Sequence, residues 1–107
     1  MPTRVTVDMP ICGYKAIIRA EKVGGSVKVE IESDCEHVKQ FADALSEVGM
    51  RDVMHISNNK IMEVAGNYLT PSCLIPCAIM NAARLEFGLI SKSLAMKKGD
   101  LRIVFEE

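Results

Sequence analysis

The chain has 107 residues and a mass of 11.8 kDa, which is enough for one domain and little more. Hydrophobic residues make up 49% and charged residues 25% of the sequence, a composition that excludes wholesale disorder. The formal net charge is −1, so no basic excess favours a nucleic acid or an anionic membrane as a partner. No apolar run approaches the roughly 18 residues of a membrane span.

The N-terminal residues do not resemble a signal peptide, because Asp8 follows Arg4 before any apolar stretch develops. We therefore expect one domain, residues 1–107, in the cytoplasm. In that reducing compartment, the four cysteines are more typical of metal or redox chemistry than of disulfides.

Alternating apolar and polar residues predict three strands in the first third of the chain, over 3–9, 14–23 and 26–33. Gly24 and Gly25 separate the last two strands and are typical of a two-residue hairpin turn. Such a turn pairs residues whose numbers sum to 49. This register places opposite charges on one face and apolar residues on the other, as cross-strand pairing favours. The pattern predicts a three-stranded antiparallel meander.

Helical spacing dominates the middle of the chain. A Ser-x-x-Glu capping box that starts at Ser33 indicates a helix over 34–48, and a second helix is predicted over 58–69. Pro76 suits the first turn of a third helix that ends near Phe87, because proline there removes no helical hydrogen bond.

The last residues predict a short helix and a strand. The helix spans 90–98 and ends at Gly99, and Leu101, Ile103 and Phe105 then alternate with other residues. The expected fold class is α+β: a three-stranded antiparallel meander followed by three or four helices and a C-terminal strand.

The meander determines where the first two cysteines lie. Cys12 precedes the second strand and Cys35 follows the third, so both belong to the same end of the sheet. In the hairpin register Cys35 falls opposite Tyr14, two residues beyond Cys12. We therefore expect Cys12 and Cys35 to be neighbours although they are distant in sequence.

The other two cysteines lie at the start of the third helix. Cys35 and Cys77 are each predicted in a first helical turn, where free N–H groups favour the thiolate, and Cys73 lies on the approach to Cys77. Thiolates bind both iron–sulfur clusters and zinc. We predict a metal site formed by Cys12, Cys35, Cys73 and Cys77 for one of these two cofactors. Packing of free cysteines in the core is the alternative for each residue.

The two histidines are weaker candidates for ligands. With Cys35 in a first helical turn, His37 lies about 200° around the helix and is expected to point elsewhere. His55 falls in the ambiguous stretch 50–57. Neither histidine is included in the predicted metal site.

The cysteine pattern resembles that of the U-type iron–sulfur cluster assembly scaffold family. In that family a Cys-Gly-Asp turn precedes a strand, a second cysteine opens a helix after the hairpin, and a third, preceded by histidine, opens a later helix. Cys12-Gly13, Cys35 and Cys77 stand at the corresponding places here. The resemblance implies a cluster on these residues and partners among the proteins of cluster or sulfur transfer. The sequence also resembles small archaeal proteins of uncharacterised family.

Two positions differ from the scaffold pattern. Tyr14 replaces the aspartate that the family associates with cluster release, and Pro76 replaces the histidine, which leaves Cys73 as the substitute ligand. The resemblance therefore supports a metal site more than cluster delivery. A thiol or persulfide redox carrier that uses Cys73 or Cys77, and a non-catalytic interaction module, stay open as alternatives. No catalytic signature is found, and a homo-oligomer is left open.

Overall fold

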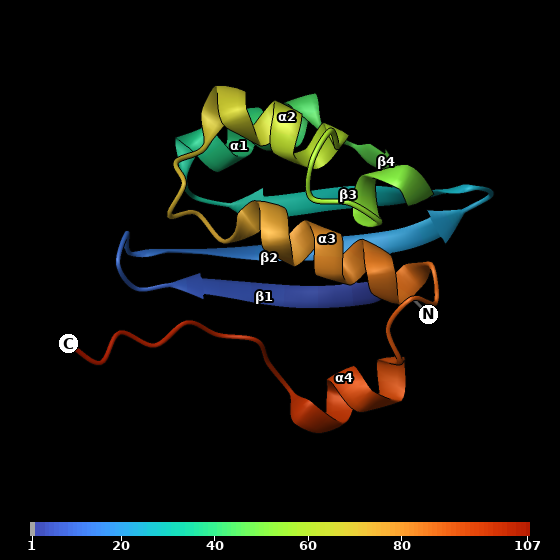
Figure 1. Ribbon diagram of the computed structural model, residues 1–107. Coiled ribbons are helices and arrows are strands. Elements are labelled where there is room, and N and C mark those ends of the chain that lie inside the picture. Colours follow the sequence, from blue (N-terminus) through green and yellow to red (C-terminus); the bar gives the residue numbers. More distant parts are fainter. Residues whose placement is uncertain (1) are drawn as a thin grey trace.

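The computed structural model describes residues 2–107 (Figure 1). The elements in chain order are β1 (Thr3–Met9), β2 (Tyr14–Val23), β3 (Ser26–Ser33), α1 (Glu36–Ala44), β4 (Glu47–Gly49), the 3-10 helix η1 (Met50–Val53), α2 (Lys60–Tyr68), α3 (Ile75–Glu86) and α4 (Lys92–Lys98). The strands form one antiparallel sheet in the order β1-β2-β3-β4. The predicted α+β class and the β1–β3 meander are confirmed. No helix within residues 2–107 is long and apolar enough to cross a membrane.

The β2–β3 hairpin has the predicted register. Val23 pairs with Ser26 and Ala16 pairs with Ser33, so opposed residues sum to 49 along the whole ladder. Gly24, the first residue of the turn, has a φ of +64°. Tight hairpin turns need positive φ at this position, and glycine adopts it without a steric penalty.

One face of the sheet is buried beneath the helices. Side chains alternate across a strand, so the register places Ile18 and Val27 on this face, and both are fully buried. Helix α3 packs on β1 and β2, whereas α1 packs on β3 (Figure 1). The helices add buried side chains of their own, among them Phe41, Ile61 and Ile79. The arrangement leaves the opposite face of the sheet polar.

The predicted helix over 34–48 is shorter than expected at both ends. The helix ends at Leu45, whose backbone is extended, and the chain continues into β4. Val48, which the helical pattern assigned to the helix, lies in β4 instead, is buried and pairs with Val27. The free edge of β3 offers backbone hydrogen bonds, and this tertiary pairing outweighs local helical spacing. Gly49 precedes η1 rather than ending a helix.

The predicted capping box at Ser33 does not form. The Ser33 hydroxyl donates to the Lys15 carbonyl at 2.8 Å and accepts from the Cys35 N–H at 3.2 Å. Cys35 becomes the N-cap residue, with extended backbone angles of φ −74° and ψ 122°. The hydroxyl therefore connects β2 to the start of α1 and leaves Cys35 just outside the helix.

The C-terminal part of the chain confirms one prediction and contradicts another. The helix expected over 90–98 is α4, and Gly99 ends it with a φ of +90°. The strand expected at Leu101, Ile103 and Phe105 is absent among the described residues, and this segment is extended and exposed. Alternation alone predicts a strand, but a strand also needs a neighbour that accepts its hydrogen bonds.

Glu86 connects α3 to the sheet and to α4. Its carboxylate accepts hydrogen bonds from the Thr3 hydroxyl and, at 3.1 Å, from the Lys22 N–H, and it forms an ion pair with Lys92 at 2.8 Å. The side chain is only 7% exposed. Burial acts to raise the pKa of Glu86, but the contacts from Lys92, Thr3 and Lys22 outweigh it and hold the pKa below its usual value.

We expect the substitution Gly24→Val to lower the free energy of unfolding by about 1 to 2 kcal/mol, because a side chain at positive φ is strained. Gly25→Ala is the matched control: Gly25 has no positive φ and no atom near its missing side chain. Urea denaturation of both variants measures the difference. Equal midpoints for the two variants would place the turn elsewhere.

Glu86→Gln should make stability less dependent on pH. Because the pKa of Glu86 is lower in the folded protein, its contribution is present above the unfolded value of about 4.3 and is lost as pH falls through the folded value. We expect the variant to lose stability at neutral pH and to show a smaller further loss in acid. Denaturation curves across this range, with the exposed Glu63→Gln as the control, measure it. An unchanged pH profile would exclude this role for Glu86.

Candidate functional site

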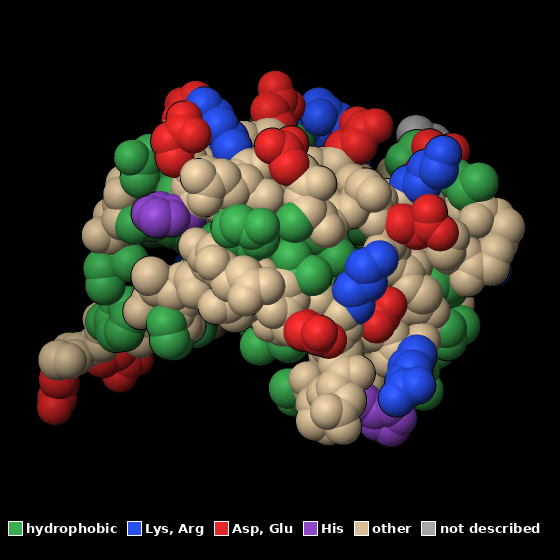
Figure 2. Space-filling view, turned by 90° about the horizontal axis from the view of Figure 1, so that it is seen from above, with side chains coloured by type: hydrophobic (Ala, Val, Ile, Leu, Met, Phe, Trp, Pro, Cys, Tyr) green, Lys and Arg blue, Asp and Glu red, His purple; other side chains and the backbone are tan. Residues whose placement is uncertain are grey.

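Three connecting segments meet at one end of the sheet. They are the β1–β2 turn, the junction between β3 and α1, and the loop from α2 to α3, all at the left of Figure 1. This end is where Cys12 and Cys35 are predicted to be neighbours. Hydrophobic side chains gather at the same end in the view from above (Figure 2).

The three segments enclose a shallow cavity of about 180 Å³. Cys12, Cys35 and Cys73 all line it, together with His37 and Tyr14. The remaining lining residues are mainly apolar: Met9, Ile11, Val38, Leu69, Thr70 and Ser72. The predicted proximity of Cys12 and Cys35 is confirmed, and Cys73 joins them. We call this the thiol cavity.

Cys12 lies in a tight turn between β1 and β2. The Met9 carbonyl accepts from the backbone N–H groups of Cys12 and Gly13, at 3.2 and 3.0 Å, and Gly13 has a φ of +79°. The turn leaves the Cys12 side chain exposed. A cysteine on such a turn approaches the cavity from its solvent side.

His37 also lines the thiol cavity, contrary to the sequence-based expectation. That expectation placed Cys35 inside the first helical turn and took the angle between Cys35 and His37 around the helix axis. Cys35 is the N-cap residue with extended backbone angles, so it stands outside the helix and the angle does not apply. His37 is exposed on the first turn of α1 and brings a nitrogen donor to the rim. Its sequence signal is its position two residues beyond a cysteine that caps the helix.

Cys73 is half-buried just before α3. Burial is the main cause that raises the pKa of its thiol, a hydrogen bond with the Ile75 N–H acts to lower it, and the nearby Cys12 and Cys35 raise it further. The net pKa is above the usual value, so the Cys73 thiol is protonated at neutral pH. The electrostatic effect of Cys12 and Cys35 on Cys73 follows from their shared place at the thiol cavity.

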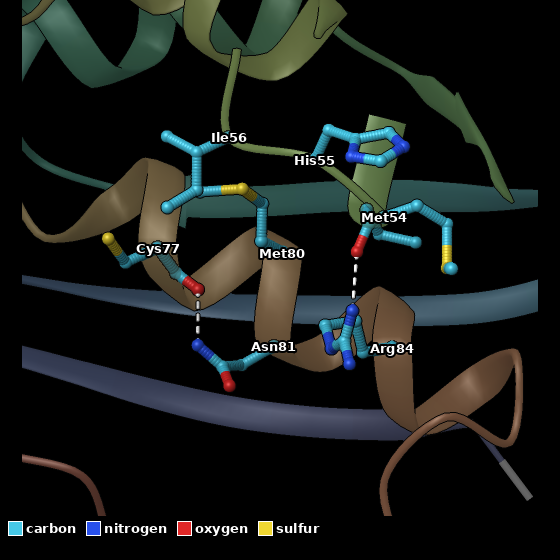
Figure 3. Close-up of a pocket in the computed structure, with 8 residues that line it drawn as sticks. Met54, His55, Ile56, Cys77, Met80, Asn81 and Arg84 are labelled. Atoms are coloured by element: carbon cyan, nitrogen blue, oxygen red, sulfur yellow. Dashed lines mark hydrogen bonds between the residues drawn. The ribbon is translucent and has the colours of Figure 1, made fainter. Parts of the chain in front are cut away.

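Cys77 is not at the thiol cavity. It lies in the first turn of α3, as predicted, and lines a second cavity of about 210 Å³ between α3, η1 and the loop that follows η1 (Figure 3). Cys73 lies before the helix, as predicted, but it lines the thiol cavity and so does not share a site with Cys77. The predicted four-cysteine grouping is therefore divided between two cavities.

The second cavity does not form a cysteine–histidine pair. Cys77 and Arg84 lie at its opposite ends, and the ring of His55 is turned toward Met54 (Figure 3). The Arg84 guanidinium donates to the Val53 carbonyl at 2.6 Å and so fastens η1 to α3. The Asn81 amide donates to the Cys77 carbonyl at 2.8 Å within α3.

The thiol cavity is not a preformed ligand cage. Within residues 2–107, no group of three or more His, Cys, Asp and Glu side chains is positioned to hold a metal ion. A metal ion in the thiol cavity would therefore require the side chains of its rim to turn inward. Cys12 and His37 are exposed and have room to do so.

Residues 3–98 match a family of unknown function, DUF6951. The chain belongs to the DUF6951 family. The match includes every strand, every helix and all four cysteines, and it ends before the extended C-terminal segment. No curated protein and no solved structure matches the chain. The family assignment thus covers the thiol cavity but does not name an activity.

Cysteine alkylation at neutral pH should follow exposure and pKa. We expect Cys12 and Cys77, which are exposed, to react several-fold faster than Cys73, which is half-buried with a raised pKa, because the thiolate is the reactive form. Iodoacetamide labelling followed by peptide mass spectrometry measures the order, with labelling in urea as the control. Labelling of Cys73 before Cys12 would contradict this description of the cavity.

Proposed function

We propose that this DUF6951 protein binds a metal centre, a zinc ion or an iron–sulfur cluster, through Cys12, Cys35 and Cys73. The observation that supports the proposal is their convergence: three cysteines from three separate connecting segments line one cavity. Thiolates are the preferred ligands of both centres. The mainly apolar surroundings would exclude water from the metal and strengthen its bonds to the thiolates.

His37 is the fourth protein ligand in this proposal and takes the place that the sequence analysis gave to Cys77. It lines the thiol cavity, whereas Cys77 lines the second one. Three cysteines and one histidine form a common tetrahedral zinc set. A closed set of four protein ligands is typical of a structural or storage site rather than a catalytic one.

Tyr14 supports retention of the metal rather than its transfer. It lines the thiol cavity at the position where the scaffold pattern has aspartate. No carboxylate among the described residues lines this cavity, so it offers no acidic group that would compete for the metal. Partners in cluster or sulfur transfer rest only on the resemblance of the cysteine pattern, and its third member, Cys77, lies outside the thiol cavity, so this part of the proposal has less support.

The two alternatives have less support. A persulfide or redox carrier needs a reactive thiolate. The raised pKa of Cys73 disfavours that role for it, and among the described residues the exposed Cys77 is the one cysteine that lines the second cavity, so no second thiol stands beside it there. A module whose cysteines only pack would bury them, yet Cys12 and Cys77 are exposed and Cys35 and Cys73 are half-buried.

Metal content and a cobalt titration test the proposal. Protein purified without oxygen should contain zinc or iron, and the metal-free protein should bind about one Co²⁺ with sulfur-to-cobalt charge-transfer absorption. Serine at Cys12, Cys35 or Cys73 should remove most of this binding, because a hydroxyl stays protonated at neutral pH. His37→Gln should weaken binding and retain the sulfur bands.

Two matched variants make the titration specific. Cys77→Ser and His55→Gln change the same residue types at the second cavity and should bind Co²⁺ like the unaltered protein. Circular dichroism of each variant separates loss of metal from loss of fold. The proposal fails if the unaltered protein contains no metal and binds none, or if Cys77→Ser abolishes binding while Cys12→Ser does not.

A further inference from the structure

The C-terminal segment 101–105 is extended, exposed and mainly apolar, and it belongs to no sheet. Its large side chains are Leu101, Ile103, Val104 and Phe105, and each is at least 61% exposed. Soluble proteins rarely expose so many apolar side chains in one stretch unless a partner covers them. The segment leaves the body of the molecule and ends beyond the β1–β2 turn (Figure 1).

Within residues 2–107, the outer edge of β1 has no strand paired to it. β1 is the outer strand of the sheet and pairs with β2 on one side. Its seven residues present a long edge of backbone groups, and the opposite edge strand, β4, has only three. A long free edge is a template for strand addition.

The segment does not satisfy this edge within its own chain. In the view of Figure 1 it runs in the same direction as β1, so pairing with its own β1 in this orientation would be parallel. A parallel register that sets Glu106 beside Asp8 also sets Arg102 beside Arg4, which places like charges together. No parallel register puts Arg102 beside Asp8 and Glu106 beside Arg4 at once.

An antiparallel register pairs opposite charges on the polar face, where Val104 also faces Thr6, and apolar side chains on the other face. When paired residue numbers sum to 110, Arg102 faces Asp8 and Glu106 faces Arg4, so two opposite charge pairs form on the polar face. The apolar face then has the pairs Leu101–Met9, Ile103–Val7 and Phe105–Val5. Met9 and Val7 belong to the buried face of the sheet, so the added side chains would extend the core. This direction is available to the segment of another molecule.

We propose that the protein forms a two-fold dimer in which each C-terminal segment adds to the partner copy's β1 as an antiparallel fifth strand. A reciprocal exchange closes after two copies and covers the long β1 edge in both of them. This inference is independent of the metal site, because it uses a different part of the chain.

Sedimentation equilibrium in a reducing buffer tests the proposal, since the reductant prevents disulfides between the exposed Cys12 and Cys77 residues. The full chain should dimerise with rising concentration, and a chain that ends at Gly99 should be monomeric. A monomeric full chain, or a dimer that persists without the segment, would overturn the proposal.

A charge exchange tests the register. Arg4→Glu and Glu106→Arg should each weaken the dimer by about tenfold, since each puts like charges opposite in both copies. The double variant should restore it. Arg4→Glu stays compatible with the fold, because Arg4 pairs with Arg19 on β2. Glu63→Arg makes the same change of charge as Glu106→Arg at an exposed position on α2, and it should leave the dimer unchanged. Failure of the double variant to restore dimerisation would contradict the register.

Discussion

The register of the β2–β3 hairpin determines where everything else in this protein lies. A turn of two residues, with Gly24 at positive φ, pairs Val23 with Ser26 and so sets each later pair. A slip of one residue would turn the whole apolar set toward solvent. The same register brings the end of β3 beside the start of β2, which places Cys35 at the end of the sheet that holds Cys12.

The parts of the fold that depend on local patterns could be predicted from the sequence. Charge and apolar alternation agree with each other in the observed hairpin register, and Pro76 marks the start of α3. The parts that depend on tertiary pairing could not be predicted. Val48 has helical spacing but enters β4, because β3 offers it a backbone partner. The segment 101–105 alternates like a strand but has no such partner within its own chain.

The candidate site also had one part that the sequence could predict and one part that it could not. Topology predicted that Cys12 and Cys35 would meet, and the structure adds Cys73 to them. The side on which His37 lies depends on where α1 begins, to within one residue. Cys35 caps its helix from outside, which lets His37 reach the thiol cavity. Sequence patterns rarely define helix ends that sharply. Cys77 lies at the second cavity because of how α3 packs against η1, which cysteine spacing does not determine.

X-ray absorption of the anaerobically purified protein, measured at the edge of the metal it contains, tests the thiol cavity most directly. The proposed site predicts a first shell dominated by sulfur at about 2.3 Å, with one nitrogen at about 2.0 to 2.1 Å if the metal is zinc. Loss of that nitrogen in His37→Gln, with the sulfur shell retained, would identify the fourth ligand. A first shell of oxygen and nitrogen alone, or a protein that holds no metal, would contradict the account.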